Sequence, residues 1–223
     1  MWVAGWLPLM FPPEPLTSGP PRRTLLIVLV EPNRDRAAER RSATRQEILD
    51  AAWEVAREKG VAAITLKDVA DRVGMRPPSL YSHFASKNAI YDAMFGQAWQ
   101  GCLEALQAAV ESLPDDPRAA LTVVGRAYFD YAVADQARNQ LMNARISADF
   151  RPSPEAYEPS QAVWELGRTR LAMIGVAAEA DLDLYSAVVG GLVDAQLAND
   201  PGGDRYARQL DRALGMLADH FGL

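Results

Sequence analysis

The sequence has little of what most metal and redox sites require. It contains one cysteine, Cys102, and two histidines, His83 and His220, which lie far apart. A single thiol cannot form an internal disulfide, and no Cys/His cluster has the spacing of a metal site. We therefore expect a cytoplasmic protein without a metal ion or other cofactor, in which Cys102 is a small buried residue on a helix.

Catalytic and membrane signals are also missing. The sequence has no GxGxxG, no P-loop, no Gly-x-Ser-x-Gly and no recognisable nucleophile–base pair. The apolar run Leu25–Val30 is far too short to cross a bilayer. These absences argue against an enzyme and against a membrane protein.

Residues 1–41 do not match a regular element. Prolines recur along the first half of this segment, and Arg22 and Arg23 come too late in the chain for the charged start of a secretory signal. We expect either a disordered extension that ends in a basic arm or a misplaced start codon, with the working protein beginning near Asn33.

The net charge is divided unevenly along the chain. The 223 residues, 49% of them hydrophobic, carry a formal net charge of −6 and suffice for one or two domains. Residues 1–95 have 13 Lys and Arg against 11 Asp and Glu, whereas residues 96–223 have 10 against 18. A mildly basic first part suits contact with phosphate, and the acidic second part argues that it does not lie on nucleic acid.

Residues 44–93 predict four short helices. The first is expected to open at Thr44, in a capping box with Glu47, and to end at Gly60. The second begins after the N-cap residue Thr65 and ends at Gly74, which makes a turn.

The third helix, Pro77–Phe84, starts with two prolines, which a first helical turn tolerates because its N–H groups have no intrahelical partner. Leu80 and Phe84 are four residues apart and are expected to face the core. Ser86 caps a fourth helix that begins at Lys87. This order is that of a helix-turn-helix, whose third helix enters the major groove of DNA by its N-terminal end.

Two groups of DNA contacts follow from these positions. Pro77 and Ser79 open the recognition helix, and we expect Arg76, Pro78 and Ser79 to lie nearest the bases. Residues on the flank of this helix and at neighbouring helix starts are expected to bind phosphate; these are Thr65, Tyr81, His83 and Lys87.

A run of arginines precedes the predicted first helix. It is either an arm that reaches the minor groove or a solvated lead-in to the helix, and it consists of Arg34, Arg36, Arg40, Arg41 and Arg45.

This segment resembles the N-terminal domain of the TetR (tetracycline-repressor-like) family of bacterial transcriptional regulators. The likeness rests on the start at Ile48–Ala52, on Val73-Gly74 and on the order Leu-Tyr-x-His-Phe-x-x-Lys at 80–87. The segment 76–78 departs from the family pattern, which bears on which operator is bound. The resemblance implies phosphate contacts by Tyr81, His83 and Lys87, and a second domain that binds an inducer or corepressor.

The remainder of the chain is also predicted to be helical, so we expect an all-α fold. We divide the chain into the extension at 1–41, a helix-turn-helix DNA-binding domain at 42–93 and a helical ligand-binding and dimerisation domain at 94–223. The loop Phe150–Pro159 interrupts the expected helices of the larger domain, which are Ile90–Leu113, Arg118–Ala134, Gln136–Ala148, Gln161–Ala178, Leu182–Leu197 and Arg205–His220.

Large side chains are numerous in the middle helices of this domain. Each one alone is typical of a core, but as a set they are candidates to line an apolar cavity between helices, where helical proteins hold small ligands. The candidates are Trp99, Tyr128, Phe129, Tyr131, Met142, Phe150, Trp164 and Met173.

The last two helices are candidates for a homodimer interface. Gly190 and Gly191 lie in mid-helix, where a glycine costs about 1 kcal/mol relative to alanine. Another helix is therefore expected to approach closely, either across a two-fold axis or inside one subunit. The predicted interface residues are Val189, Gly190, Leu192, Leu197, Leu210, Leu214 and Leu217.

These features predict a ligand-responsive transcriptional regulator. We expect a repressor that binds a palindromic operator in double-stranded DNA as a homodimer and responds to an unknown small-molecule effector. The alternative is a sequence-specific DNA-binding protein that is controlled by a protein partner and has no small-molecule ligand. An enzyme that carries a helix-turn-helix is disfavoured because no catalytic residues can be assigned.

Overall fold

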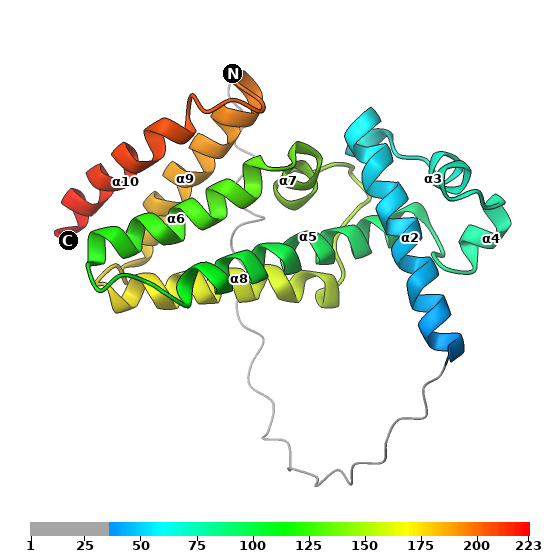
Figure 1. The fold of residues 1–223 in the computed structure, drawn as a ribbon, viewed down its shortest axis with the longest axis horizontal. Helices are drawn as coiled ribbons and strands as arrows, with labels where there is room; N and C mark the ends of the chain where they lie inside the picture. Colours follow the sequence, from blue (N-terminus) through cyan, green and yellow to red (C-terminus); the bar gives the residue numbers. More distant parts are fainter. Residues whose placement is uncertain (1–35) are drawn as a thin grey trace, which may run out of the picture.

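The computed structural model describes residues 36–223, in which every regular element is a helix, as predicted. A small head at one end of the molecule is joined by the long helix α5 to a larger bundle (Figure 1). The head contains α2 (Arg36–Lys59), the short η1 (Val61–Ala63), α3 (Leu66–Val73) and α4 (Pro77–Tyr81). The expectations for residues 1–35 lie outside the described residues.

The larger bundle is built around α5, which packs against α6 and α8. None of the helices within residues 36–223 has the length and apolar character needed to cross a membrane. The helices that follow the head are α5 (Lys87–Val110), α6 (Pro117–Val133), α7 (Gln136–Asn143), α8 (Pro154–Met173), α9 (Glu179–Asn199) and α10 (Ala207–Phe221).

The head has the predicted turns and caps. Gly60 and Gly74 have φ angles of 88° and 74°, a left-handed conformation that glycine adopts without strain. The hydroxyl oxygens of Thr65 and Ser86 accept the backbone N–H groups three residues ahead, each at 3.1 Å, and so cap α3 and α5. Leu80 is fully buried, as is Phe84 three residues after α4, so the predicted core face of the third helix is confirmed.

The first helix begins at Arg36, so the prediction that it opens at Thr44 is wrong. Thr44 lies inside α2 and forms no capping box with Glu47. The segment 36–43 consists of Arg, Ala, Glu and Ser, most of them strong helix formers, and no residue in it stops a helix. The described part of the predicted basic arm is therefore helical, and α2 runs through the boundary that we placed after residue 41.

Two arginines of α2 hold the chain that follows α4. Arg41 donates to the carbonyl of Ser82 at 3.1 Å, and Arg45 donates to the carbonyl of His83. The Arg45 guanidinium also lies 4.0 Å from the centre of the Phe84 ring. Carbonyl groups at the end of a helix lack intrahelical partners, so these arginines fix the end of the recognition helix against α2.

The predicted loop Phe150–Pro159 is wrong over its second half, where α8 has already begun. Ser153 caps α8 by accepting the N–H of Ala156 at 3.1 Å, and Pro154 occupies the first helical position, where its missing N–H costs nothing. Pro159 lies inside the helix and removes one hydrogen bond near its exposed start. The prolines therefore open α8 instead of preventing it.

Two other helices end earlier than predicted. The predicted Gln136–Ala148 stops at Asn143, because Ala144 is extended. The predicted Gln161–Ala178 stops at Met173, because Gly175 turns the chain with a φ angle of 99°.

Helix α5 is bonded to both parts of the molecule. Near its start, the Tyr91 hydroxyl donates to the carbonyl of Val61 in the head at 2.6 Å. The next residue, Asp92, accepts from the backbone N–H and the hydroxyl of Ser153, at 2.6 and 2.8 Å. The start of α8 is therefore bonded directly to the first turns of α5, the helix that follows the recognition turn.

Close helix approach occurs at Gly125 of α6. A Cβ atom added there would lie 2.8 Å from the Tyr185 hydroxyl and 2.9 Å from a Leu214 methyl group. Added Cβ atoms at Gly190 and Gly191 would meet nothing within 4 Å. The expectation of a tight contact inside one subunit at these two glycines is therefore wrong.

Cys102 is buried, as expected for a thiol on a helix that faces the core. Burial raises the pKa of the Cys102 thiol to about 12. The thiolate, which is the reactive form, is therefore scarce at neutral pH.

We expect Gly125→Ala to lower the free energy of unfolding by about 1–3 kcal/mol, because the added methyl group overpacks the contact between α6, α9 and α10. Urea unfolding followed by circular dichroism measures this change. Gly167→Ala in α8 is the matched control, since a Cβ atom added there would meet nothing within 4 Å. Its free energy of unfolding should rise by up to about 1 kcal/mol. Equal stability of Gly125→Ala and the natural chain would contradict the packing described for α6.

Arg45→Met should lower the free energy of unfolding by about 1–3 kcal/mol. The methionine keeps apolar contact with Phe84 but loses the charge-assisted hydrogen bond to the carbonyl of His83. Arg40→Met, at an exposed residue of the same helix, should change stability by less than about 0.5 kcal/mol. If both variants unfold at the same urea concentration, Arg45 does not hold the recognition turn.

Candidate nucleic-acid interface and effector cavity

The predicted base-reading residues lie together on the exposed side of α4. Arg76, Pro77, Pro78 and Ser79 are all exposed, whereas Leu80 anchors the helix in the core. Neither the Arg76 guanidinium nor the Ser79 hydroxyl has a hydrogen bond or ion pair with another described residue. Both side chains are therefore available to base edges in a major groove.

The predicted phosphate-binding residues surround this surface. Tyr81 is 52% exposed on the flank of α4, and His83 is half-buried with a buried Nδ1 that has no partner among residues 36–223. The Lys87 ammonium donates to the carbonyl of Ala62 at 3.1 Å and lies 5.0 Å from the centre of the Tyr91 ring. An ammonium has three N–H donors, so Lys87 retains donors for a phosphate.

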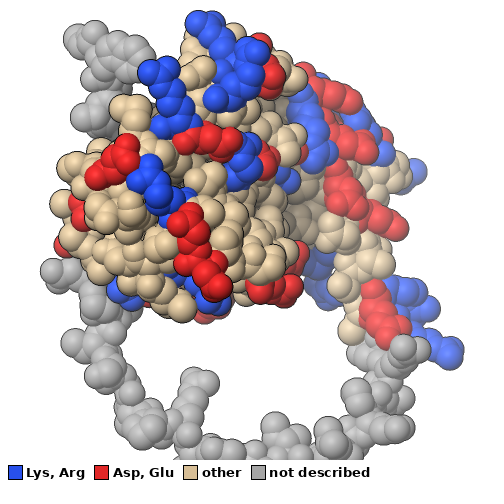
Figure 2. All heavy atoms as spheres, turned by 60° about the vertical axis from the view of Figure 1, so that its left-hand side comes forward, with Lys and Arg blue, Asp and Glu red and all other residues tan. Residues whose placement is uncertain are grey.

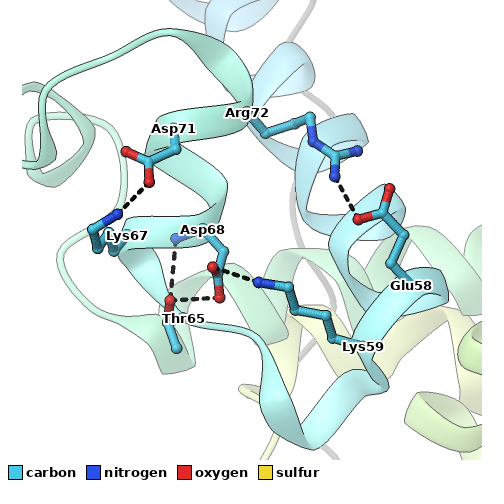
Figure 3. Close-up of polar contacts among 7 residues, drawn as sticks. All are labelled: Glu58, Lys59, Thr65, Lys67, Asp68, Asp71 and Arg72. Atoms are coloured by element: carbon cyan, nitrogen blue, oxygen red, sulfur yellow. Dashed lines mark hydrogen bonds and ion pairs between the residues drawn. The ribbon is translucent and has the colours of Figure 1, made fainter.

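Thr65 is already engaged at the start of α3. Its hydroxyl donates to the Asp68 carboxylate at 2.7 Å, and that carboxylate also binds Lys59 at 2.6 Å (Figure 3). These bonds lower the pKa of Asp68, with the bond from Lys59 as the largest cause. A phosphate that binds here must share the helix start with a carboxylate, which opposes an anion.

The cations on the α3 side of the head are paired with carboxylates. The bond to Glu58 is the largest of the effects that raise the pKa of Arg72, and the same bond lowers the pKa of Glu58. Several of these pairs are drawn in Figure 3. The N–O distances range from 2.5 to 2.8 Å in the pairs Lys59–Asp68, Lys67–Asp71, Arg72–Glu54 and Arg72–Glu58.

Other cations of the head are arranged differently. Arg36, Arg40 and Arg76 are exposed and form no ion pair with any residue that the structure describes. Arg76 directly precedes α4, whereas Arg36 and Arg40 lie four residues apart on the exposed start of α2. The unpaired cations of the head thus accumulate at the starts of α2 and α4.

The face of the protein drawn in Figure 2 has no such accumulation over the larger bundle. Lys and Arg side chains alternate there with Asp and Glu, and uncharged surface separates them. This mixture matches the acidic composition of residues 96–223. The head is therefore the part of the chain suited to a polyanion.

A cavity of about 100 Å³ lies between α5, α6, α8 and α9. Three of the predicted residues, Trp99, Tyr128 and Trp164, line it. Apart from Trp164, the sequence analysis did not predict the lining contributed by α8 and α9, which includes Tyr157, Ser160, Gln161, Leu171, Leu182 and Tyr185.

The other predicted lining residues lie elsewhere. Phe129 and Met142 belong to the core, and Met173 is 71% exposed. Tyr131 and Phe150 are partly buried and pack against the core of the head and α5. The prediction was wrong for these five because it rested on side-chain size, which does not distinguish a cavity wall from a core.

The lining of the cavity is mainly apolar, and it includes a buried donor that has no partner among the described residues. The Trp99 side chain is buried, and its indole N–H has no hydrogen-bond partner among the described residues. The Tyr185 hydroxyl donates to the carbonyl of Leu121 at 3.1 Å. Burial raises the pKa of both Tyr128 and Tyr185, so both phenols stay protonated at neutral pH. Arg168, a further lining residue, pairs with Glu165 at 2.7 Å.

Most of the predicted dimer-interface residues are buried inside the subunit. The side chains of Val189, Leu210, Leu214 and Leu217 form one core cluster together with α6, so they cannot meet a second subunit. Gly190, Leu192 and Leu197 retain some exposed surface. The exposed apolar and small residues of α9 and α10 are instead Leu184, Ala187, Gly191, Ala198 and Met216, and Val188 and Ala195 retain some exposed surface beside them.

Residues 48–94 match the sequence profile described as bacterial regulatory proteins of the tetR family. The chain is 27% identical to the transcriptional activator FasR of Mycolicibacterium smegmatis, over 62% of this chain and 69% of that protein. It is also 27% identical to the class A tetracycline repressor protein from transposon 1721 of Escherichia coli, over 71% of this chain and 69% of the repressor.

The whole fold also has a solved counterpart. The TetR family transcriptional regulator PfmR of Thermus thermophilus superposes with a TM-score of 0.58 at 22% identity, over 76% of this chain and 96% of PfmR. This likeness extends the agreement from the head to the larger helical bundle. Residues 48–94 therefore form a DNA-binding domain of the tetR type, and the chain as a whole is similar in sequence to two regulators that carry this domain and in fold to PfmR.

Proposed function

We propose that the protein is a homodimeric repressor that binds a palindromic operator through α4 and releases it when a small apolar effector occupies the cavity. The observation that carries the DNA-binding part is the contrast within the head. The cations near α3 are paired with carboxylates, whereas Arg76 at the start of α4 and Arg36 and Arg40 at the start of α2 have no carboxylate partner among the described residues.

In this proposal the contacts to bases and to phosphates come from different residues. Arg76 and Ser79 hydrogen-bond to base edges, with Pro77 and Pro78 beside them, because they lie on the exposed start of α4. Thr65, Tyr81, His83 and Lys87 bind phosphates around this surface. Arg36 and Arg40, which the sequence analysis assigned either to an arm that reaches the minor groove or to a solvated lead-in, add phosphate contacts from the exposed start of α2.

The effector that best fits the cavity is small, uncharged and mostly apolar, with one hydrogen-bond acceptor. The acceptor would satisfy the buried indole N–H of Trp99, because an unpaired buried donor costs about 1–3 kcal/mol. A cavity of about 100 Å³ is smaller than an engineered cavity of roughly 150 Å³ that binds benzene. A larger effector must therefore push α8 or α9 outward.

Displacement of α8 reaches the head through α5. Ser153 at the start of α8 is bonded to Asp92, and Tyr91 beside it is bonded to the carbonyl of Val61. A second link runs from Arg57 of α2 to Asp135 at the start of α7, at 2.8 Å. Linkage requires that DNA weaken effector binding by the same factor by which the effector weakens DNA binding.

Two copies would associate through the outward faces of α9 and α10. Leu184, Val188, Gly191 and Ala195 recur at helical spacing along α9, and the exposed Met216 lies on α10. A Cβ atom added at Gly191 would meet nothing within 4 Å, so packing inside the subunit does not require a glycine there. Close approach of a symmetry-related α9 accounts for the glycine, and it presents two recognition helices to one palindrome.

We expect Lys87→Ala and Arg40→Ala to weaken binding to every DNA sequence about equally. Each should lower the slope of log affinity against log salt by about 1 per half-site, because a phosphate contact is lost. Arg208→Ala on α10 is the control, since this exposed arginine pairs only with Asp204, at 3.5 Å, among the described residues. Fluorescence anisotropy at several salt concentrations measures the slope.

Arg76→Ala or Ser79→Ala should instead change which sequence is preferred, by about 1–3 kcal/mol at one base pair for a well-made contact. Selection of preferred sites from random DNA with each variant measures this. If Lys87→Ala reorders the sequence preference while these two variants leave it unchanged, α4 enters the groove in another orientation.

The effector proposal is tested by release of the selected operator on addition of small apolar alcohols, ketones and esters. Gly167→Val should occupy part of the cavity from α8 without the volume needed to push α8 or α9 outward, so it should retain operator binding and weaken release by any active compound. Thr169→Val, at an exposed position outside the cavity lining on the same helix, should behave like the natural chain. Operator binding that no compound and no cavity variant affects would favour the alternative, a regulator controlled by a protein partner.

Val188→Glu together with Gly191→Leu should give a folded monomer by light scattering, because a buried charge and a bulky side chain would separate the two α9 helices. The monomer should bind a half-site and a full palindrome with similar affinity. Thr169→Glu serves as the control and should remain dimeric. An unchanged dimer mass for the double variant would place the interface elsewhere.

A further inference from the structure

Pro78 lies on the side of α4 opposite the core of the head. At roughly 100° per helical residue, Pro78 stands about 160° around the helix from Leu80, which is fully buried. Pro77 and Pro78 are both exposed. Two adjacent pyrrolidine rings therefore form the leading apolar surface of the recognition helix.

Within α4, the backbone of residues 77–80 offers no free hydrogen-bond donor to DNA. Pro77 and Pro78 have no N–H group. The N–H groups of Ser79 and Leu80 both donate to the carbonyl of Arg76, at 2.9 and 3.4 Å. Hydrogen bonding to bases from this surface is left to the Arg76 and Ser79 side chains, with the proline rings between them.

A ring without donors or acceptors discriminates between base edges. Adenine, guanine and cytosine present polar groups in the major groove, whereas thymine also presents an apolar 5-methyl group. A pyrrolidine ring packed over a polar edge would remove its water without replacing the hydrogen bond, which costs free energy. The same ring packed against a methyl group buries apolar surface on both sides.

We infer that Pro78, with Pro77 beside it, reads thymine in the operator through its 5-methyl group. This assignment rests on the proposed function, because it requires α4 to lie in the major groove. Beyond the proposed function, the inference names the chemical group, a thymine methyl, that is recognised at one position of each half-site. Arg76 and Ser79 read the neighbouring positions by hydrogen bonds.

The experiment replaces single thymines of the selected operator by deoxyuridine, which has the same hydrogen-bonding groups and no methyl group. The natural chain should bind about fourfold more weakly for each methyl group that Pro78 contacts. Replacing thymines outside the recognised positions should have no effect. Binding is measured by anisotropy at one fixed salt concentration.

Pro78→Ser then assigns the effect to this residue. The variant should bind the thymine and deoxyuridine operators equally, while Pro201→Ala, at an exposed proline between α9 and α10, keeps the fourfold difference. Circular dichroism and the binding of non-specific DNA at low salt confirm that the variant head is folded.

Three outcomes would overturn the inference. A discrete operator that is insensitive to every thymine replacement would refute methyl reading and leave the proposed function standing. A fourfold difference that persists in Pro78→Ser would show that another residue reads the methyl group. Failure to select any preferred sequence would refute the inference together with the proposed function.

Discussion

The buried hydrogen bond from the Tyr91 hydroxyl to the carbonyl of Val61 fixes the head on the rest of the protein. The Phe150 ring packs edge-on against the Tyr91 ring, with 5.5 Å between the ring centres, and the Lys87 ammonium lies over the Tyr91 ring. Tyr91 therefore connects the head, the loop before α8 and the start of α5 at one point. Because the bond is buried, breaking it would leave two polar groups unsatisfied, so the head moves with α5 rather than apart from it.

This constraint gives meaning to the distribution of charge. A head fixed on α5 keeps one orientation relative to the larger bundle. Arg36, Arg40 and Arg76 have no carboxylate partner among the described residues, whereas the ion pairs around α3 lower the net positive charge of that part of the head (Figure 3). The weak net charge of residues 1–95 thus conceals an uneven distribution of charge.

The sequence predicted the parts of the head that depend on local chemistry. The caps at Thr65 and Ser86, the turns at Gly60 and Gly74 and the buried Leu80 and Phe84 follow from rules that act within four residues. The start of α2 was missed because the capping-box spacing of Thr44 and Glu47 was given more weight than the helix propensity of the residues before them. The cavity and the outward face of α9 depend on which side of each helix meets another helix. Residue size and periodicity do not encode that choice, so Phe129 could not be distinguished from a cavity wall, nor Leu214 from a dimer contact.

The two prolines of α4 also affect the entropy of DNA binding. Each pyrrolidine ring holds φ near −65°, the value that a helix requires, before any DNA is present. Together with the arginines that hold the other end of the helix, they leave the backbone of α4 little freedom to lose when it enters a groove. A recognition helix of five residues would be too short to be stable alone. In this head it is preorganised at both ends, so ordering it subtracts little from the free energy of association.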